Sequence, residues 1–433
     1  MPYFADLLLQ ELRSKREEVF RILKASELFL KKYRELFSRR WLQLDGIEES
    51  LENVYAVDSS NDEVALSGGG VILFTRSLAL APNGCEVRRL RLDAFYPKRV
   101  HMYEEYRRLI REYMEHEAAL KAIEEGAKYV LIDGSLYGRM LHVLYELDIE
   151  GRESFMLEYV RKYGELLSEA RSKGVILVGV SKDSRSTLFK EEVLWREVVS
   201  HALKREDINI LGELWGELQT NPRKTMEKLR RMVKEGSVDD YVYWLFEEAR
   251  SAVPDSKIIS LLSLEPGFST PLHLRVDRVY IGTILLILSE DEGTLLQKLV
   301  GSFQKSADKQ GCEFETLAVE VVRNLKKYPS VVTFYTVLEK GDDPIRVDIA
   351  LSDSKALPAD GRFLSEVPEE VHGALGLLRS LYAGVRGYNV LLLEADRKVK
   401  MSVETIKTYT EMLTREYGEL LFHSRGERRV FYP

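Results

Sequence analysis

The sequence contains little cysteine, and its two cysteines, Cys85 and Cys312, lie far apart. Neither belongs to a CxxC pair, which argues against a cysteine-held zinc site and against a disulfide framework. We expect both to be free, buried thiols. The seven histidines do not occur at HxxxH or HExxH spacing, so a zinc hydrolase is not indicated either.

Long apolar runs are also missing. No run approaches the roughly 20 residues that a membrane-spanning helix needs. The first residues, MPYFADLLLQELRSKREE, become charged within one or two helical turns and lack the cationic, apolar and small-residue order of a signal peptide. The sequence therefore predicts no membrane association and a cytoplasmic location.

An excess of positive charge is the third absence. The net charge is −7 and the pI is about 5.8, whereas a protein that simply coats nucleic acid has a strongly basic domain. An enzyme that acts on nucleic acid is not excluded, because it concentrates carboxylates in its active site and needs basic groups only along the substrate path. With 45% hydrophobic and 31% charged residues, the composition is that of an ordinary globular protein.

Residues 1–45 form a first, N-terminal segment. Apolar residues recur there at mostly helical spacing among many charges over 5–40. We expect one or two amphipathic helices. They either pack on the main domain or serve as a dimerisation or DNA-channel element.

Residues 46–185 combine strand and helix patterns. Three extended segments come first, and the first of them, VYAVD (54–58), is followed by a predicted turn, SSNDE. The other patterns in this region are strands in ALSGGGVILFTRSLAL and LRLDAFYP, a helix over 103–126, a strand over 129–133, a helix over 154–173 and a strand over 175–181. This order predicts an α/β fold with a ribonuclease H-like mixed sheet, flanked by helices and carrying an antiparallel meander at one side.

The alternation of strand and helix patterns stops at residues 186–263, which we interpret as a helical insertion. It returns over 264–433, which we interpret as the second half of the core. The patterns in this second half are strand signals over 278–288, a hairpin over 331–351 around the turn GDDP, a helix near 367–383, a strand over 388–396 and a helix over 403–416.

Two acidic residues close predicted strands: Asp58 ends VYAVD and Asp133 ends YVLID. Ligands gather at the carboxyl ends of strands in α/β sheets, and two carboxylates at such an edge repel one another. A divalent cation relieves this repulsion, and oxygen ligands suit Mg²⁺ or Mn²⁺. A pair of such ions could activate water and stabilise the leaving oxygen in phosphodiester hydrolysis. The alternative is that each aspartate is a turn or cap residue.

The sequence around both aspartates resembles the NurA family of DNA-end-processing nucleases. VYAVDSS (54–60) resembles the first family motif, an apolar strand followed by Asp-Gly-Ser, with Ser59 in place of the glycine. VLIDGSL (130–136) resembles the second motif, Asp-Gly-Ser-Leu, without departure, and GVSKDSRS (179–186) is similar to the family's strand-exit motif. The resemblance covers roughly residues 50–185 and 265–400.

The resemblance implies further site residues. The glutamate that the family places on the helix before the second motif matches Glu115, with Glu117 as the alternative. Lys182 matches the strand-exit lysine and would offset charge on the scissile phosphate. TFYTVLEKGDDPIRVDIA (333–350) resembles a tyrosine-containing strand followed by an arginine-bearing one, so Tyr335 and Arg346 are expected to contact nucleic acid.

The last family motif departs. The family commonly has Tyr-Pro, a short apolar strand and then Ala-His, whereas this chain has Tyr388-Asn389 and later Ala395-Asp396. An aspartate can also ligate a hard cation, so the expected metal ligands are four acids: Asp58, Glu115, Asp133 and Asp396. The change from histidine leaves two alternatives open, an altered metal preference and an inactive paralogue.

The resemblance also implies properties that the residues alone do not indicate. NurA-type enzymes are homodimers with a ribonuclease H-like fold. They use manganese to degrade DNA from 5′ ends and to cut single strands, and they act with HerA, a hexameric DNA translocase, in double-strand-break end resection. For this chain we accordingly expect two Mn²⁺ ions, with Mg²⁺ as the alternative.

Basic residues also cluster in RKTMEKLRRMVK (223–234), where Arg230 and Arg231 are the central pair. This helix face either follows a DNA backbone or is simply solvated. Two competing functions remain at this point. One is an actin-like ATP-dependent kinase, although no second glycine-rich phosphate hairpin or adenosine motif is evident, and the other is an inactive NurA-like subunit that binds DNA or the translocase.

Overall fold

A mixed ten-stranded sheet forms the centre of the molecule in the computed structural model, which describes residues 4–23, 27–49, 51, 53–202, 205–351 and 362–418. The strand order is β1-β7-β11-β12-β6-β5-β2-β3-β4, and β8 pairs with β11. The strands are β1 (Trp41–Gln43), β2 (Val54–Ala65), β3 (Val71–Leu80), β4 (Glu86–Phe95), β5 (Tyr129–Asp133), β6 (Ile176–Ser181), β7 (Gly267–Ser269), β8 (Leu272–Leu274), β11 (Val331–Val337) and β12 (Ile345–Ala350).

The first five long strands have the predicted ribonuclease H-like arrangement. β2, β3 and β4 form an antiparallel meander, β5 is parallel to β2, and β6 is parallel to β5. The hairpin β11–β12 extends this sheet through an antiparallel contact between β12 and β6. The predicted fold class is therefore confirmed.

Strand β2 is longer than predicted, because SSNDE is not a turn but continues the strand to Ala65. Its polar side chains find partners inside the fold: the Asn61 side chain donates to the Arg107 carbonyl (2.7 Å), and the Ser60 hydroxyl donates to the Val399 carbonyl. The turn instead falls at the three glycines, where Gly68 and Gly69 have φ near +90°. Asp58 consequently lies within a strand and not at its end.

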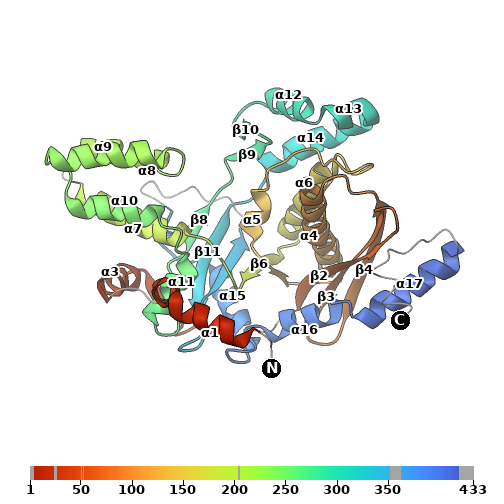
Figure 1. Cartoon of the computed structure of the whole chain (residues 1–433), viewed down its shortest axis with the longest axis horizontal. Helices are drawn as coiled ribbons and strands as arrows, with labels where there is room; N and C mark the ends of the chain where they lie inside the picture. The colour runs from red at the N-terminus through yellow and green to blue at the C-terminus, as the bar shows by residue number, and fades with distance from the viewer. Residues whose placement is uncertain are drawn as a thin grey trace.

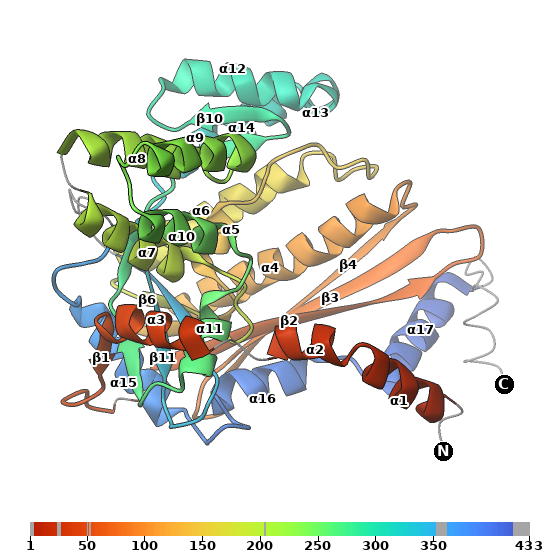
Figure 2. The same ribbon diagram turned by 60° about the vertical axis from the view of Figure 1, so that its left-hand side comes forward.

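Helices cover both faces of the sheet (Figures 1 and 2). One face carries α4 and α6, and the other carries α15, α16 and α17, with apolar side chains of the strands buried between. The helices of the core and its N-terminal segment are α1 (Ala5–Ser14), α2 (Arg16–Leu23), α3 (Glu27–Ser38), α4 (Val100–Glu124), α5 (Leu136–Met140), α6 (Phe155–Ser172), α15 (Glu369–Ser380), α16 (Val390–Val399) and α17 (Val403–Tyr417).

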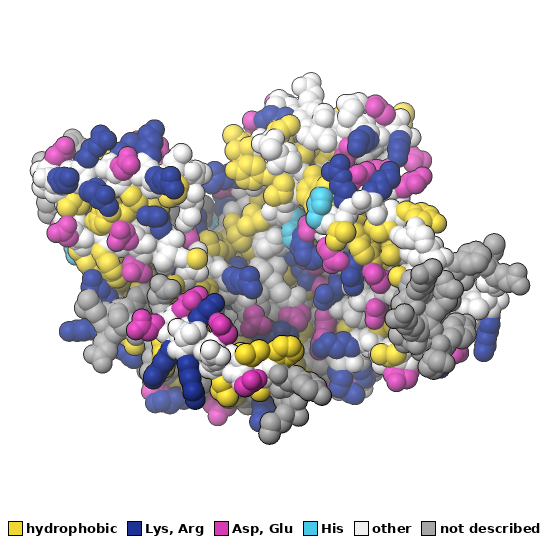
Figure 3. Space-filling view, in the orientation of Figure 1, with side chains coloured by type: hydrophobic (Ala, Val, Ile, Leu, Met, Phe, Trp, Pro, Cys, Tyr) yellow, Lys and Arg dark blue, Asp and Glu magenta, His cyan; other side chains and the backbone are white. Residues whose placement is uncertain are grey.

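Two helical lobes rise from the sheet, and the surface is hollowed between them (Figures 1 and 3). The first lobe lies within residues 186–263, for which helices were predicted, and is made of α7 (Leu188–His201), α8 (Arg205–Glu217), α9 (Pro222–Lys234), α10 (Asp240–Arg250) and α11 (Asp255–Leu262). The second lobe was not predicted as such; it contains α12 (Glu292–Ser302), α13 (Gln304–Gln310), α14 (Cys312–Lys326) and the separate hairpin of β9 (Arg278–Ile281) and β10 (Ile284–Ile287).

Three smaller expectations need correction. The segment predicted as a strand over 388–396 is the helix α16, because the Asn389 side chain accepts from the Leu392 amide and caps it (3.0 Å). The N-terminal segment contains three helices and not one or two. Cys85 and Cys312 are exposed, not buried. In the part of the chain that the structure describes, no helix combines the length and apolarity needed to span a membrane.

Candidate active site

Asp58 and Asp133 meet on neighbouring parallel strands. Val57 of β2 is in register with Ile132 of β5, so the next residue of each strand, Asp58 and Asp133, carries its carboxylate to the same face of the sheet. Asp58 is 4% exposed, and the Asp133 side chain is 26% exposed. The pair therefore has one buried member and one member that opens to solvent.

The surroundings of Asp58 disfavour its charge. Burial, together with the negative charges of Glu115, Asp133 and Asp396, raises the pKa of the Asp58 carboxyl to about 7. One hydrogen bond, from the Ser59 amide to Asp58 Oδ1 (2.7 Å), acts in the opposite direction. Three acids from one strand and two helices, far apart in sequence, thus act on the charge of Asp58.

Glu115, and not Glu117, is the α4 glutamate whose charge acts on Asp58. Both oxygens of Glu115 already have protein partners: the Ser59 hydroxyl donates to Oε1 (2.5 Å), and the Arg139 guanidinium pairs with Oε2. Ser59 and Glu115 lie on the α4 face of β2, because successive residues of a strand point to opposite faces. The predicted place of Glu115 among the metal ligands does not agree with these contacts.

Asp396 and Lys182 lie near the aspartate pair. Asp396 comes from α16, and its carboxylate pairs with Lys400 (2.6 Å). The ammonium of Lys182, at the exit of β6, is 3.3 Å from Asp133 Oδ2 and stands over the ring of Tyr388, 5.3 Å from its centroid. Partial burial lowers the pKa of Lys182, but the attraction of Asp133 and Tyr388 outweighs burial and raises the pKa overall. Lys182 therefore stays positively charged.

The donor atoms suit a hard divalent cation, because Asp58, Asp133 and Asp396 offer carboxylate oxygens only. The raised pKa of Asp58 has the same implication, since a cation would offset the repulsion that burial intensifies. The ligands are not yet assembled: within the described ranges, no three acidic, histidine or cysteine side chains stand close enough together to hold a metal ion. Asp396 would have to exchange Lys400 for the cation.

The remaining predicted residues lie elsewhere. Tyr335 is 3% exposed, and its hydroxyl faces the Ser184 hydroxyl (3.4 Å). Arg346 is buried on β12 and pairs with Asp348 (3.1 Å). These positions leave little of either side chain at the surface, so direct contact with nucleic acid is not supported. Arg230 and Arg231 lie on α9 in the first lobe and not with the acids.

Sequence reasoning missed residues that shape the site. Arg139 on α5 is buried against Glu115, and its guanidinium also donates to the Asp133 carbonyl (3.1 Å). Asp348 accepts from the Ser135 hydroxyl, which holds the turn after Asp133 (2.5 Å). Neither has a motif signal, because a lone arginine on a short helix and an aspartate within a strand are common. Tyr388 belongs to the last motif, but only the position of the Lys182 ammonium over its ring indicates a role.

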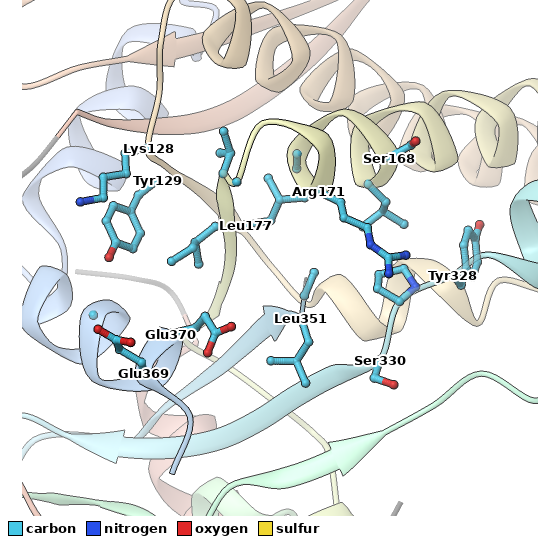
Figure 4. Close-up of a pocket in the computed structure, with 18 of the residues that line it drawn as sticks. Lys128, Tyr129, Ser168, Arg171, Leu177, Tyr328, Ser330, Leu351, Glu369 and Glu370 are labelled. Carbon is cyan, nitrogen blue, oxygen red and sulfur yellow. The ribbon is translucent and has the colours of Figure 1, made fainter. Parts of the chain in front are cut away.

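A large cavity is separate from the acids. It has a volume of about 1130 Å³ and opens where β5 and β6 begin, beside Tyr129 and Leu177 (Figure 4). Asp133 lies at the other end of β5. Arg171 and Tyr328 line the side of this cavity away from Tyr129, but none of the four acids lines it.

The chain matches the family model described as the NurA domain over residues 52–401. The crystal structure of the NurA nuclease from Sulfolobus solfataricus is similar over 95% of this chain and 98% of that chain, with 15% sequence identity and a TM-score of 0.54. No curated protein matches the chain in sequence.

Two further crystal structures are similar at lower scores. One is of NurA, over 93% of this chain and 97% of that chain, with 16% identity and a TM-score of 0.43. The other is of NurA bound to dAMP and manganese, over 95% and 96%, with 16% identity and a TM-score of 0.39. These scores are too low to add to the first similarity. The family match spans every acid of the site, and the chain belongs to the NurA domain family.

Proposed function

We propose that this protein is a metal-dependent deoxyribonuclease that hydrolyses phosphodiester bonds of DNA. The observation that carries the proposal is the pairing of Asp58 with Asp133 on adjacent strands, with Asp396 close enough to act on the charge of Asp58. Membership of the NurA domain family supports the same activity, since the related Sulfolobus solfataricus protein is a nuclease. Neither competing reading, an actin-like kinase or an inactive subunit, draws support from an observation of this kind.

Asp58, Asp133 and Asp396 would hold the cation, Mn²⁺ or Mg²⁺, and a pair of ions is the expected number. When bound, it would lower the pKa of water and stabilise the leaving oxygen. Asp133 is the more exposed of the two strand aspartates and would therefore meet the substrate first. Lys182 would attract the scissile phosphate as a point charge, and Tyr388 beneath it would keep the ammonium beside Asp133.

The helix α9 would add DNA affinity away from the acids. Its cations are exposed, whereas Met226 and Leu229 on its other side are buried. Arg230 also contacts the Tyr243 hydroxyl (2.9 Å). An exposed cationic face of this kind binds phosphates without reading sequence. We therefore propose that Arg230 and Arg231 contact the phosphate backbone of DNA.

The N-terminal helix α1 supports the predicted assembly into a homodimer or with a HerA-type translocase. None of its residues is buried, and its apolar side chains, together with the preceding Phe4, are left exposed: Phe4, Leu7, Leu8, Leu9 and Leu12. Exposed apolar residues gathered in this way mark a contact surface. The 5′–3′ exonuclease and single-strand endonuclease activities, the role in end resection and the cytoplasmic location remain predictions.

The test is cleavage of labelled single-stranded and duplex DNA by the full chain with Mn²⁺, Mg²⁺ or EDTA. We expect cleavage that requires the metal and falls at least about 1,000-fold in Asp58→Ala and in Asp133→Ala. Each substitution removes a ligand of the cation, and the cation stabilises transition-state charge by several kcal/mol. Asp62→Asn is the matched control, since Asp62 lies on the same strand but outside the acidic group. A folded protein without cleavage under any metal would exclude the nuclease, and ATP binding would then be measured.

A further inference from the structure

We infer that the buried ion pair of Glu115 and Arg139 is a positioning device that sets the separation of Asp58 and Asp133. This inference rests on the proposed nuclease function. It assigns Glu115 a role behind the metal ligands and not among them. It also brings in Arg139, which no motif indicated.

The contacts form a closed path between the two aspartates. The Ser59 hydroxyl, next to Asp58 in β2, donates to Glu115 Oε1 (2.5 Å). Glu115 Oε2 pairs with the Arg139 guanidinium, and the same nitrogen of Arg139 donates to the main-chain carbonyl of Asp133 (3.1 Å). A neighbour of one aspartate and the backbone of the other are therefore tied to a single ion pair.

The pair is built to stay in place. The side chains of Arg139 and Glu115 are 5% and 4% exposed, so separating them would leave uncompensated buried charges at a large energetic cost. The second guanidinium nitrogen of Arg139 faces His116 Nε2 (3.0 Å). Burial and the charge of Arg139 lower the pKa of His116, so the neutral ring can accept this bond. The planar fork of arginine thus contacts three groups, which a lysine ammonium cannot reproduce in the same geometry.

The path matters because both aspartates sit where small shifts change metal geometry. Asp133 is the last residue of β5, and Gly134 immediately adopts φ +105°, a conformation that side chains other than hydrogen rarely allow. The Asp133 carbonyl is therefore at a sharp change of chain direction. The hydrogen bond from Arg139 fixes the position of the Asp133 carbonyl. Because Arg139 is also paired with Glu115, and Glu115 accepts from Ser59, this carbonyl is fixed relative to β2.

The experiment compares Arg139→Met, Arg139→Lys, Glu115→Gln and the double variant Glu115→Gln/Arg139→Gln in the full chain. Arg152→Met is the matched control, because Arg152 also pairs with a buried acid, Asp93 (2.6 Å), on β4 outside the site. For each protein, Mn²⁺ binding is measured directly by electron paramagnetic resonance without DNA, alongside kcat and KM for DNA cleavage and metal-free thermal unfolding.

We expect Arg139→Met to weaken Mn²⁺ binding and lower kcat by about 10- to 100-fold, as is typical for residues that orient metal ligands, with KM for DNA unchanged. Arg139→Lys should lie between this variant and the unsubstituted protein. Arg152→Met should lower thermal stability without changing Mn²⁺ binding. The double variant should bind Mn²⁺ better than Glu115→Gln alone, because it leaves no unpaired buried charge.

Two results would overturn the inference. One is Mn²⁺ binding by folded Arg139→Met that equals that of the unsubstituted protein. The other is a double variant no better than Glu115→Gln, which would make Glu115 a direct ligand. Absence of Mn²⁺ binding and cleavage in the unsubstituted protein would instead refute the proposed function itself, so the two failures are distinguishable.

Discussion

The acidic site and the basic helix α9 use charge in opposite ways. At the site, Asp58 is buried, and this burial together with the charges of nearby carboxylates raises the pKa of Asp58 to about 7. On α9, the cations face solvent, and Arg230 contacts the hydroxyl and the ring of Tyr243. Buried charges interact strongly and depend on exact neighbours, whereas exposed charges are screened and act additively. Substitutions should therefore have large, specific effects at the site and small, cumulative effects on α9.

The largest effect that separates the two regions is expected at Asp396. Asp396→Ala should lower the cleavage rate by about 100-fold, because it removes a carboxylate that acts on Asp58. Steady-state cleavage of labelled DNA over a range of Mn²⁺ concentrations measures this. Glu394→Ala is the control on the same helix, since Glu394 pairs with Arg397 at the surface (2.7 Å).

Asp396→His would then test whether the family's usual histidine restores or changes the metal preference. Equal rates for Asp396→Ala and the unsubstituted protein would exclude Asp396 as a metal ligand and leave Asp58 and Asp133 as the acids that hold the metal.

An intermediate effect is expected at Asp255, a buried carboxyl at the base of the first lobe. Asp255 accepts from the amides of Phe189 and Lys190 (3.0 and 2.8 Å), yet burial raises its pKa to about 7. The folded state thus keeps a proton that the unfolded state loses near pH 4. This contribution to stability is fully present below about pH 4 and is lost as the pH rises to about 7.

Denaturant unfolding at about pH 5 and about pH 8 should show this directly. Between these two pH values, the free energy of unfolding should fall by at least about 1 kcal/mol more in the unsubstituted protein than in Asp255→Asn, given about 1.4 kcal/mol per pKa unit. Parallel pH profiles for the two proteins would contradict the raised pKa and would make Asp255 an ordinary ionised cap.

The smallest effect is expected on α9. Arg230→Ala/Arg231→Ala should weaken duplex DNA binding only several-fold and reduce the slope of log affinity against log salt by about 2, because each lost phosphate contact contributes about 0.9. The value of kcat should not change. Fluorescence anisotropy at several salt concentrations measures the slope.

The control for α9 is Lys407→Ala/Arg415→Ala, which removes two exposed cations from α17. An equal loss of salt dependence in both double variants would mean that α9 has no special position on the DNA path. A lower kcat in the α9 variant would mean that this lobe takes part in the reaction itself and does not only bind DNA.

Local patterns were sufficient for much of the core. The apolar runs that became β5 and β6, the helical periodicity of α4 and α6, and the two aspartate motifs depend on neighbours in sequence, so they predicted the ribonuclease H-like order correctly. Prediction failed where side chains found distant partners. SSNDE was predicted to be a turn because its residues are polar. It continues strand β2 because the Asn61 and Ser60 side chains donate to the Arg107 and Val399 carbonyls, which only the fold brings near.

The sequence by itself determined the family, the mixed sheet and the identity of Asp58 and Asp133, because strand order and acid-bearing motifs are local properties. The tertiary structure alone decided how the other charges are used. In the folded chain, Asp396 lies on a helix, and Tyr335 and Arg346 are buried. Glu115 forms an ion pair with Arg139. A charged side chain becomes a ligand, a surface contact or half of a buried pair according to which distant groups surround it, and burial makes that choice energetically decisive.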